Sequence, residues 1–174
     1  MSVEKSLEEI KKFWPEDAPD VTNVPKYIKK YKKNLIVIKY GGNVLIDRNI
    51  FNNFIQDISV LNKLGLSIVV VHGGGPRIER ELKKEKIQSN FINGLRVTDK
   101  NVINIVEKVL VEFNKDIVES LNKKGSKAVS INTKTNNVID VVPDKPELGY
   151  VGVPQEINIE IINNIISQNQ IPIV

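Results

Sequence analysis

Apolar residues in this chain form short continuous runs that alternate with longer stretches of helical spacing. Residues 35–38 and 66–71 are continuous apolar runs, as expected for strands that are buried on both faces. Residues 50–64 and 77–86 carry the helical periodicity that follows each run. Because a strand, a helix, a second strand and a second helix follow in this order, the pattern predicts an α/β fold. We expect a mainly parallel sheet with helices on both faces.

The second half of the chain continues this alternation. A long helix is expected up to residue 124, with Thr98 as its N-cap, and another helix over residues 159–167. Strand-like segments are predicted at 127–131, 138–142 and 171–174, with a loop or edge strand at 147–153. Because the last segment is apolar and ends the sequence, we expect an exposed sheet edge there and a truncation before a further half of the protein.

The first 33 residues have a different pattern. Residues 4–14 predict a short amphipathic helix, and prolines interrupt the stretch that follows. One interpretation is a packed extension of the main domain. The other is an oligomerisation arm that carries Phe13 and Trp14 into a partner chain. We therefore divide the sequence into an N-terminal helical arm, residues 1–33, and a domain over residues 34–174.

Composition excludes several kinds of site. The 174 residues have a formal net charge of +4 and no cysteine, which excludes disulfides and thiolate metal sites. His72 is the only histidine, so a histidine-rich metal site is excluded too. The lysine-rich stretch 26–33 does not favour nucleic-acid binding. No apolar run approaches the roughly 20 residues that span a membrane, and no signal peptide is evident. These features predict a cytoplasmic protein with no membrane partner.

Glycines end each of the first two apolar runs. Gly41 and Gly42 follow the first run, and three consecutive glycines, residues 73–75, follow the second. Glycine lets the backbone turn sharply and approach a ligand, and a helix that opens after such a turn presents free N–H groups to an anion. The alternative is a tight strand-to-helix turn without a ligand. A dinucleotide-binding motif would need glycine at Ile78, so that signal is weak.

Two basic side chains complete the candidate site. Lys39 ends the first apolar run, where its ammonium group suits a phosphoryl group in transfer, although a surface lysine is the alternative. Arg96 follows a glycine and precedes a helix, where a guanidinium group suits a carboxylate, although such an arginine alone is more often a surface residue. We interpret His72 as a polar packing residue. These features suggest phosphoryl transfer to a small acid.

Three motifs, in this order and spacing, resemble those of the acetylglutamate kinases in the amino-acid kinase superfamily. They are Ile-Lys-Tyr-Gly-Gly-Asn at 38–43, Val-Val-His-Gly-Gly-Gly-Pro at 70–76 and Gly-Leu-Arg-Val-Thr-Asp at 94–99. A further segment, Leu-Gly-Tyr-Val-Gly at 148–152, also looks like that family. The resemblance covers about residues 35–174.

The resemblance implies ATP-dependent phosphorylation of the side-chain carboxylate of N-acetyl-L-glutamate, a step of arginine biosynthesis. Mg²⁺ is expected to arrive with ATP, with no metal ligand from the protein. The implied roles are transition-state stabilisation by Lys39, ATP phosphate binding by Gly41 and Gly42, acceptor carboxylate binding by Gly74 and Gly75, and α-carboxylate binding by Arg96.

The resemblance also implies a homo-oligomer, either a dimer or a hexamer, with arginine as a possible effector. In this family the nucleotide lies on a C-terminal half that follows the segment at 171–174. We therefore expect this chain to be the acetylglutamate-binding half, with the ATP-binding domain absent. The alternatives are a non-catalytic acetylglutamate-binding or oligomerisation module, and a kinase of a related acylated amino acid such as acetylaminoadipate.

Overall fold

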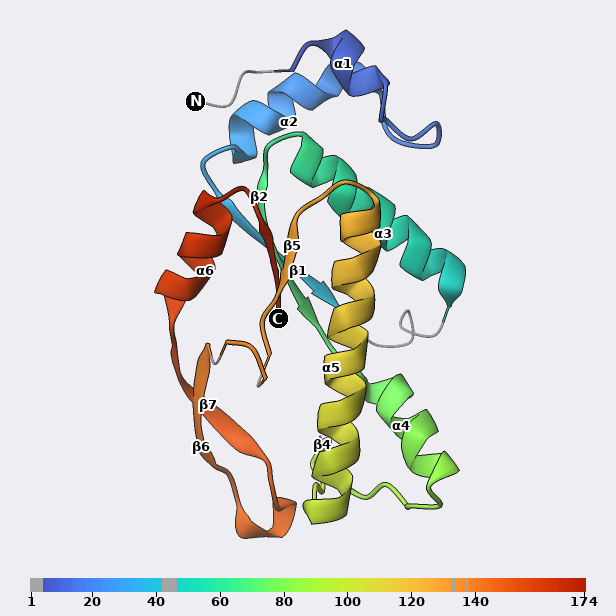
Figure 1. The fold of residues 1–174 in the computed structure, drawn as a ribbon, viewed down its shortest axis with the longest axis vertical. Helices are drawn as coiled ribbons and strands as arrows, with labels where there is room; N and C mark the ends of the chain where they lie inside the picture. Colours follow the sequence, from blue (N-terminus) through green and yellow to red (C-terminus); the bar gives the residue numbers. More distant parts are fainter. Residues whose placement is uncertain (1–4, 42–46, 133, 137) are drawn as a thin grey trace.

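The computed structural model describes residues 5–41, 47–132, 134–136 and 138–174 (Figure 1). Its helices are α1 (Leu7–Lys11), α2 (Val24–Tyr31), α3 (Arg48–Lys63), α4 (Gly75–Lys84), α5 (Lys100–Lys123) and α6 (Ile159–Ser167), with short 3₁₀ helices η1 (Val21–Asn23) and η3 (Pro146–Leu148). Its strands are β1 (Leu35–Tyr40), β2 (Ser67–His72), β3 (Phe91–Ile92), β4 (Leu95–Arg96), β5 (Ala128–Ser130), β6 (Ile139–Pro143), β7 (Gly152–Ile157) and β8 (Ile171–Ile173).

Four of these strands form a parallel sheet in the order β1-β2-β8-β5. The side chains of β2 alternate between its two faces. Ile68 and Val70 belong to a core that includes residues of α3 and α5, whereas Val69 packs in a separate core with Ile162 and Ile165 of α6. Helices therefore lie on both faces, α3 and α5 on one and α6 on the other (Figure 1). The predicted α/β fold is confirmed.

The positions of the first and last strands differ from the prediction. β1 is an edge strand whose Leu35 and Val37 side chains are 41% and 61% exposed, so it is not buried on both faces. β8 lies between β2 and β5, and its Ile171 and Ile173 side chains are fully buried. The expected exposed edge at 171–174 is therefore wrong. An apolar run indicates a strand, but only long-range pairing decides whether that strand is central.

The start of α5 also differs from the prediction, because Asp99 and not Thr98 is the N-cap. The Asp99 carboxylate accepts hydrogen bonds from the N–H groups of Asn101 at 2.8 Å and Val102 at 2.9 Å. Thr98 instead joins α5 to the segment before β7, since Thr98 and Gly149 form an isolated bridge.

A two-stranded hairpin extends from the sheet (Figure 1). β6 pairs with β7 in antiparallel fashion and has no partner in the parallel sheet within the described residues. The segment expected to be a loop or edge strand at 147–153 contains the end of η3 and the start of β7. The prediction of a strand near 138–142 is confirmed with a shift of one residue.

The N-terminal arm packs on its own chain. Ile10 is fully buried, and the Trp14 Nε1–H donates to the Pro19 carbonyl at 2.8 Å. The Phe13 ring centroid lies 5.8 Å from Nζ of Lys63 in α3. α1 is shorter than the predicted helix, because Ser6 caps it in a capping box with Glu9 and it ends at Lys11. These contacts agree with the interpretation of a packed extension.

No helix in the described ranges is both long enough and apolar enough to cross a membrane.

Substitutions in the central strand β8 should lower the free energy of unfolding more than substitutions in the edge strand β1. Ile173→Ala should lower the free energy of unfolding by about 2–5 kcal/mol, because it opens a cavity in a core that is fully buried. Val37→Ala, on the open face of β1, should cost less than about 1 kcal/mol. Urea denaturation of both variants measures the difference, and equal costs would contradict a central β8.

Candidate functional site

The two predicted glycine turns meet at the carboxyl edge of the sheet. β1 and β2 pair in register, with Tyr40 opposite His72, so the residues that follow each strand are neighbours. The Gly73 N–H donates to the Tyr40 carbonyl at 2.9 Å, and a Cβ atom placed on Gly73 would lie 3.9 Å from Cα of Gly41. Gly42, the second predicted phosphate-binding glycine, lies outside the described residues.

Lys39 lies beside the first of these turns. A Cβ atom on Gly41 would lie 3.6 Å from Cε of Lys39, so this side chain runs along the turn. Lys39 is exposed, and in the ranges 5–41, 47–132, 134–136 and 138–174 it forms no ion pair with a carboxylate. Its ammonium group is therefore available to an anion at the turn.

Gly74 and Gly75 form the start of α4. Gly74 is the N-cap and provides no side-chain cap, so the first N–H groups of α4 keep their capacity to bind an anion. A Cβ atom on Gly74 would lie 2.6 Å from Cδ2 of Leu110, whereas one on Gly75 would meet no atom within 4 Å. An added methyl group at Gly74 would thus displace the end of the Leu110 side chain. At Gly75 the packing leaves open space in front of the helix.

Arg96 lies in β4 and faces α4 rather than solvent. Its Nη1 atom donates to Oε2 of Glu79 at 3.1 Å and to Oγ of Ser89, and its guanidinium group lies 4.6 Å from the Phe91 ring centroid. The Arg96 side chain is only 13% exposed. A hydrogen bond from Ser89, together with the charge of Arg96, lowers the pKa of Glu79 below its usual value. Arg96 therefore already holds one carboxylate.

The contact with Glu79 shows where Arg96 lies relative to the glycine turn. Glu79 follows Gly75 by four residues in α4, which places it on the same side of the helix and about 6 Å further along the axis. This separation is similar to the length of a small dicarboxylic acid. The structure thus brings together Lys39, Gly41 and the turn at 73–75, and Arg96 contacts α4 about one helical turn beyond that turn.

The fourth motif lies against the segment that carries Arg96. The Thr98 N–H donates to the Leu148 carbonyl at 2.9 Å, and the Tyr150 N–H donates to the Thr98 carbonyl at 2.7 Å. Gly149, between them, has a φ of +71°, a conformation that side-chain-bearing residues rarely adopt. The motifs at 94–99 and 148–152, although distant in sequence, therefore pack against each other.

A cavity of about 650 Å³ lies between α5 and the β6–β7 hairpin, next to the glycine turn. Its lining is mostly apolar, and Leu110 joins it to Gly74. His72 and Asn114 give it a polar end. Sequence reasoning missed Asn114, although a polar residue among the apolar core positions of α5 was a signal that could have identified it.

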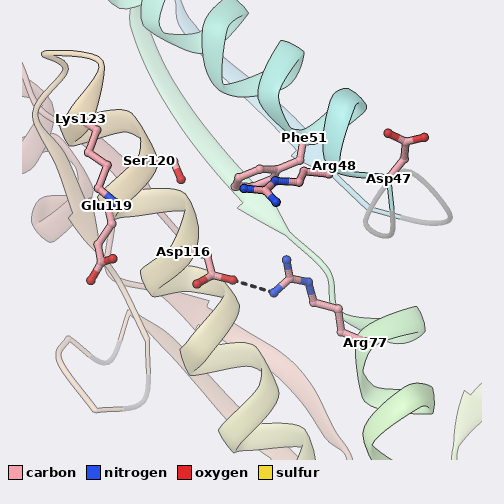
Figure 2. A pocket seen from close by; sticks show the side chains of 8 residues that line it. All are labelled: Asp47, Arg48, Phe51, Arg77, Asp116, Glu119, Ser120 and Lys123. Atoms are coloured by element: carbon pink, nitrogen blue, oxygen red, sulfur yellow. Dashed lines mark hydrogen bonds and ion pairs between the residues drawn. The ribbon is translucent and has the colours of Figure 1, made fainter.

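A second pocket, of about 370 Å³, lies between the start of α3, the first turn of α4 and the C-terminal half of α5 (Figure 2). Arg77, in the first turn of α4, crosses it and donates from Nη1 to Oδ2 of Asp116 at 2.7 Å. The same guanidinium group lies 3.8 Å from the Phe113 ring centroid. These contacts hold the start of α4, and hence the glycine turn, against the middle of α5.

No group of three or more histidine, cysteine, aspartate or glutamate side chains in the described part of the chain is arranged to hold a metal ion.

Gly149→Ala should destabilise the chain more than Gly94→Ala. Both glycines have positive φ, so each substitution carries a backbone strain of about 1–3 kcal/mol. A Cβ atom on Gly149 would also lie 2.3 Å from the Thr98 carbonyl oxygen, whereas one on Gly94 meets nothing within 4 Å. Denaturant titration should show an additional loss of about 1–3 kcal/mol for Gly149→Ala. Equal losses would argue against the packing of the two motifs.

The amino acid kinase family matches this chain over residues 34–174. An acetylglutamate kinase from Pelagibacter ubique (strain HTCC1062) is 52% identical to it, over 96% of this chain and 58% of the relative. An acetylglutamate kinase from Caldanaerobacter subterraneus subsp. tengcongensis is 44% identical, over 85% of this chain and 50% of the relative. The chain thus spans about half the length of the curated relatives it matches.

Solved structures show the same fold. The protein smu.665 from Streptococcus mutans UA159 is 30% identical, with a TM-score of 0.70 over 80% of this chain and 57% of that one. An N-acetylglutamate synthase from Neisseria gonorrhoeae, in complex with coenzyme A and N-acetyl-glutamate, is 20% identical with a TM-score of 0.73, over 87% of this chain and 35% of that one. Together with the match over residues 34–174, these similarities show that the chain belongs to the amino acid kinase family.

Proposed function

We propose that this chain is the acetylglutamate-binding half of an acetylglutamate kinase. The reaction would transfer the γ-phosphoryl group of ATP to the side-chain carboxylate of N-acetyl-L-glutamate, with release of ADP. The observation that carries the proposal is the geometry at the sheet edge. Lys39 and Gly41 lie beside the turn at 73–75 that begins α4, and Arg96 contacts Glu79, about one helical turn further along α4. The names of the relatives agree with this assignment.

The acid would lie along the first turn of α4. Its side-chain carboxylate would accept hydrogen bonds from the backbone N–H groups of Gly74 and Gly75, where the positive end of the helix dipole favours an anion. Its α-carboxylate would pair with Arg96. Within the described residues, this guanidinium donates its hydrogen bonds from Nη1, which leaves Nε and Nη2 to donate to a second carboxylate.

Lys39 would act on the phosphoryl group in transfer. A carboxylate oxygen attacks the γ-phosphorus, the bond to the β–γ bridging oxygen breaks, and negative charge spreads over the equatorial oxygens. An ammonium group beside the Gly41 turn stabilises that charge without a covalent intermediate. The contribution of the chain is therefore positioning and electrostatic stabilisation.

ATP would be shared with residues outside this sequence. Gly41 and Gly42 would border the phosphates, and the base and ribose would bind to a further half of the protein. Mg²⁺, when bound, neutralises phosphate charge. Its ligands would be phosphate oxygens and water, as is usual for Mg²⁺ that arrives with a nucleotide.

The proposal includes self-association of the chain. Tyr27 in α2 is 54% exposed and Leu7 in α1 is 37% exposed, so the arm keeps apolar surface that a second copy could cover. Arginine regulation belongs to the same proposal and would act on such an assembly.

Arg96→Ala should weaken binding of N-acetyl-L-glutamate at least about tenfold, because a charge-assisted hydrogen bond to a carboxylate is lost. Isothermal titration calorimetry on the purified chain measures the dissociation constant. Arg80→Ala, which removes an exposed arginine from the same helix α4, is the matched control and should bind like the wild type. Equal affinity of the wild type and Arg96→Ala would exclude Arg96 as a carboxylate ligand.

Gly75→Ala should separate binding from stability. Nothing lies within 4 Å of the added methyl group, and alanine favours a helix, so the free energy of unfolding should stay constant or rise by up to about 1 kcal/mol. Affinity for the acid should fall at least about tenfold, because the methyl group occupies the space in front of the binding N–H groups. Thermal unfolding and calorimetry measure both effects. Unchanged affinity in a folded variant would place the acid elsewhere.

A further inference from the structure

Five polar groups form a continuous chain of hydrogen bonds across the carboxyl edge of the sheet. Asn132 donates from Nδ2 to Oγ of Ser130 at 2.6 Å, and Ser130 donates to Oδ1 of Asn114. Asn114 is almost fully buried in α5, and its Nδ2 atom lies 3.2 Å from Nε2 of His72. The Nδ1 atom of His72 lies 3.0 Å from the carbonyl oxygen of Gly73, the first glycine of the turn.

A backbone carbonyl fixes the orientation of the Asn114 amide. Nδ2 of Asn114 lies 2.9 Å from the carbonyl oxygen of Ile173 in β8. A carbonyl oxygen only accepts hydrogen bonds, so the atom facing it must be the NH₂ group. Because the same NH₂ group faces Nε2 of His72, that ring nitrogen must accept a hydrogen bond and carries no proton.

A second carbonyl leads independently to the same protonation state. The Gly73 carbonyl oxygen accepts only, so Nδ1 of His72 must donate to it and must carry the proton. Neutral imidazole has one N–H and one acceptor nitrogen, and both requirements are satisfied by the Nδ1–H tautomer. An imidazolium would instead place an Nε2–H group against the Asn114 NH₂ group.

The surroundings of His72 also favour the neutral ring. Burial lowers the pKa of His72, and the positive charge of Arg77 lowers it further, although the hydrogen bond to Gly73 acts in the opposite direction. Arg77 comes from α4 and is paired with Asp116 of α5. On the cavity side the lining contains one acid, Glu107 of α5, and it pairs with Lys134.

We propose that Asn114 is a positioning residue for the glycine turn. It holds His72 as the neutral Nδ1–H tautomer, and the Nδ1–H group fixes the Gly73 carbonyl immediately before the N–H groups of Gly74 and Gly75. Because the amide of Asn114 also binds β8 and β5, the orientation of the turn is tied to the centre of the sheet. The importance of this arrangement for acid binding rests on the proposed function, but the tautomer does not.

The single histidine makes the tautomer directly measurable. Two-bond ¹H–¹⁵N correlation spectra of the chain, purified without a histidine tag, contain the ring of His72 alone. We expect a pyrrole-type shift for Nδ1 and a pyridine-type shift for Nε2 at neutral pH. The opposite assignment, or a charged imidazolium at that pH, would overturn the proposal without any ligand or variant.

Asn114→Asp should change both the tautomer and the titration of His72. A carboxylate at this position accepts and does not donate, so it should draw the proton to Nε2 and stabilise the imidazolium. The midpoint of the His72 titration should rise by roughly 1–3 pH units. Asn122→Asp, which adds the same charge to α5 and keeps the acceptor for the Ala128 N–H, is the control and should leave the spectrum unchanged. An unchanged midpoint in folded Asn114→Asp would contradict the assignment.

Acid binding tests the positioning role separately. If the wild type binds N-acetyl-L-glutamate, Asn114→Asp should bind it at least tenfold more weakly, and Asn122→Asp should bind normally. Normal binding by Asn114→Asp with a changed tautomer would overturn the positioning role.

If the wild type shows no binding, the proposed function fails, and the tautomer is still decided by the spectrum of the free chain. Should Asn114→Asp not fold, Asn114→Gln, which keeps the donor, provides the second variant and should retain the Nδ1–H tautomer.

Discussion

The in-register parallel pairing of β1 and β2 is the constraint on which the candidate site depends. It places Tyr40 opposite His72, so β1 and β2 end side by side at the edge of the sheet. The glycines that follow the two strands are therefore neighbours. The Gly73 N–H then binds the Tyr40 carbonyl, which closes the junction between the turns. A slip of one residue would move Lys39 to the other face and separate the turns.

Much of the fold was predictable because helices and strands leave local signals. The apolar runs identified the strands of the parallel sheet but not the short pair β3 and β4, and the prediction of α6 over residues 159–167 matched its observed bounds. Strand order was not predictable in this way. β8 is central and β1 is at the edge, yet both have apolar runs, because the signal reports burial potential and not the partner strand. The hairpin of β6 and β7 was missed for the same reason, since its pairing joins segments separated by η3.

In the candidate site, too, local features were predictable from the sequence and long-range contacts were not. Lys39 and the glycines were recognisable from local sequence, since a glycine turn between a strand and a helix is a local feature. Glu79 and Asn114 were not recognised, because their roles arise only from contacts across the fold. Glu79 approaches Arg96 over 17 positions of sequence, and Asn114 approaches His72 over 42. In the sequence, Glu79 is one more charged residue of a helix, and Asn114 is one polar residue in an apolar stripe. Each becomes informative only when its partner is known.

The most direct test of the account is a two-dimensional ¹H–¹⁵N spectrum of the chain, titrated with N-acetyl-L-glutamate. We expect saturable shifts concentrated on the amides of Gly74 and Gly75 and on the Nε–H of Arg96, since these groups would bind the two carboxylates of one ligand. Saturable shifts confined to other parts of the chain, with the amides of the turn unmoved, would contradict the account. So would the absence of shifts in a folded chain.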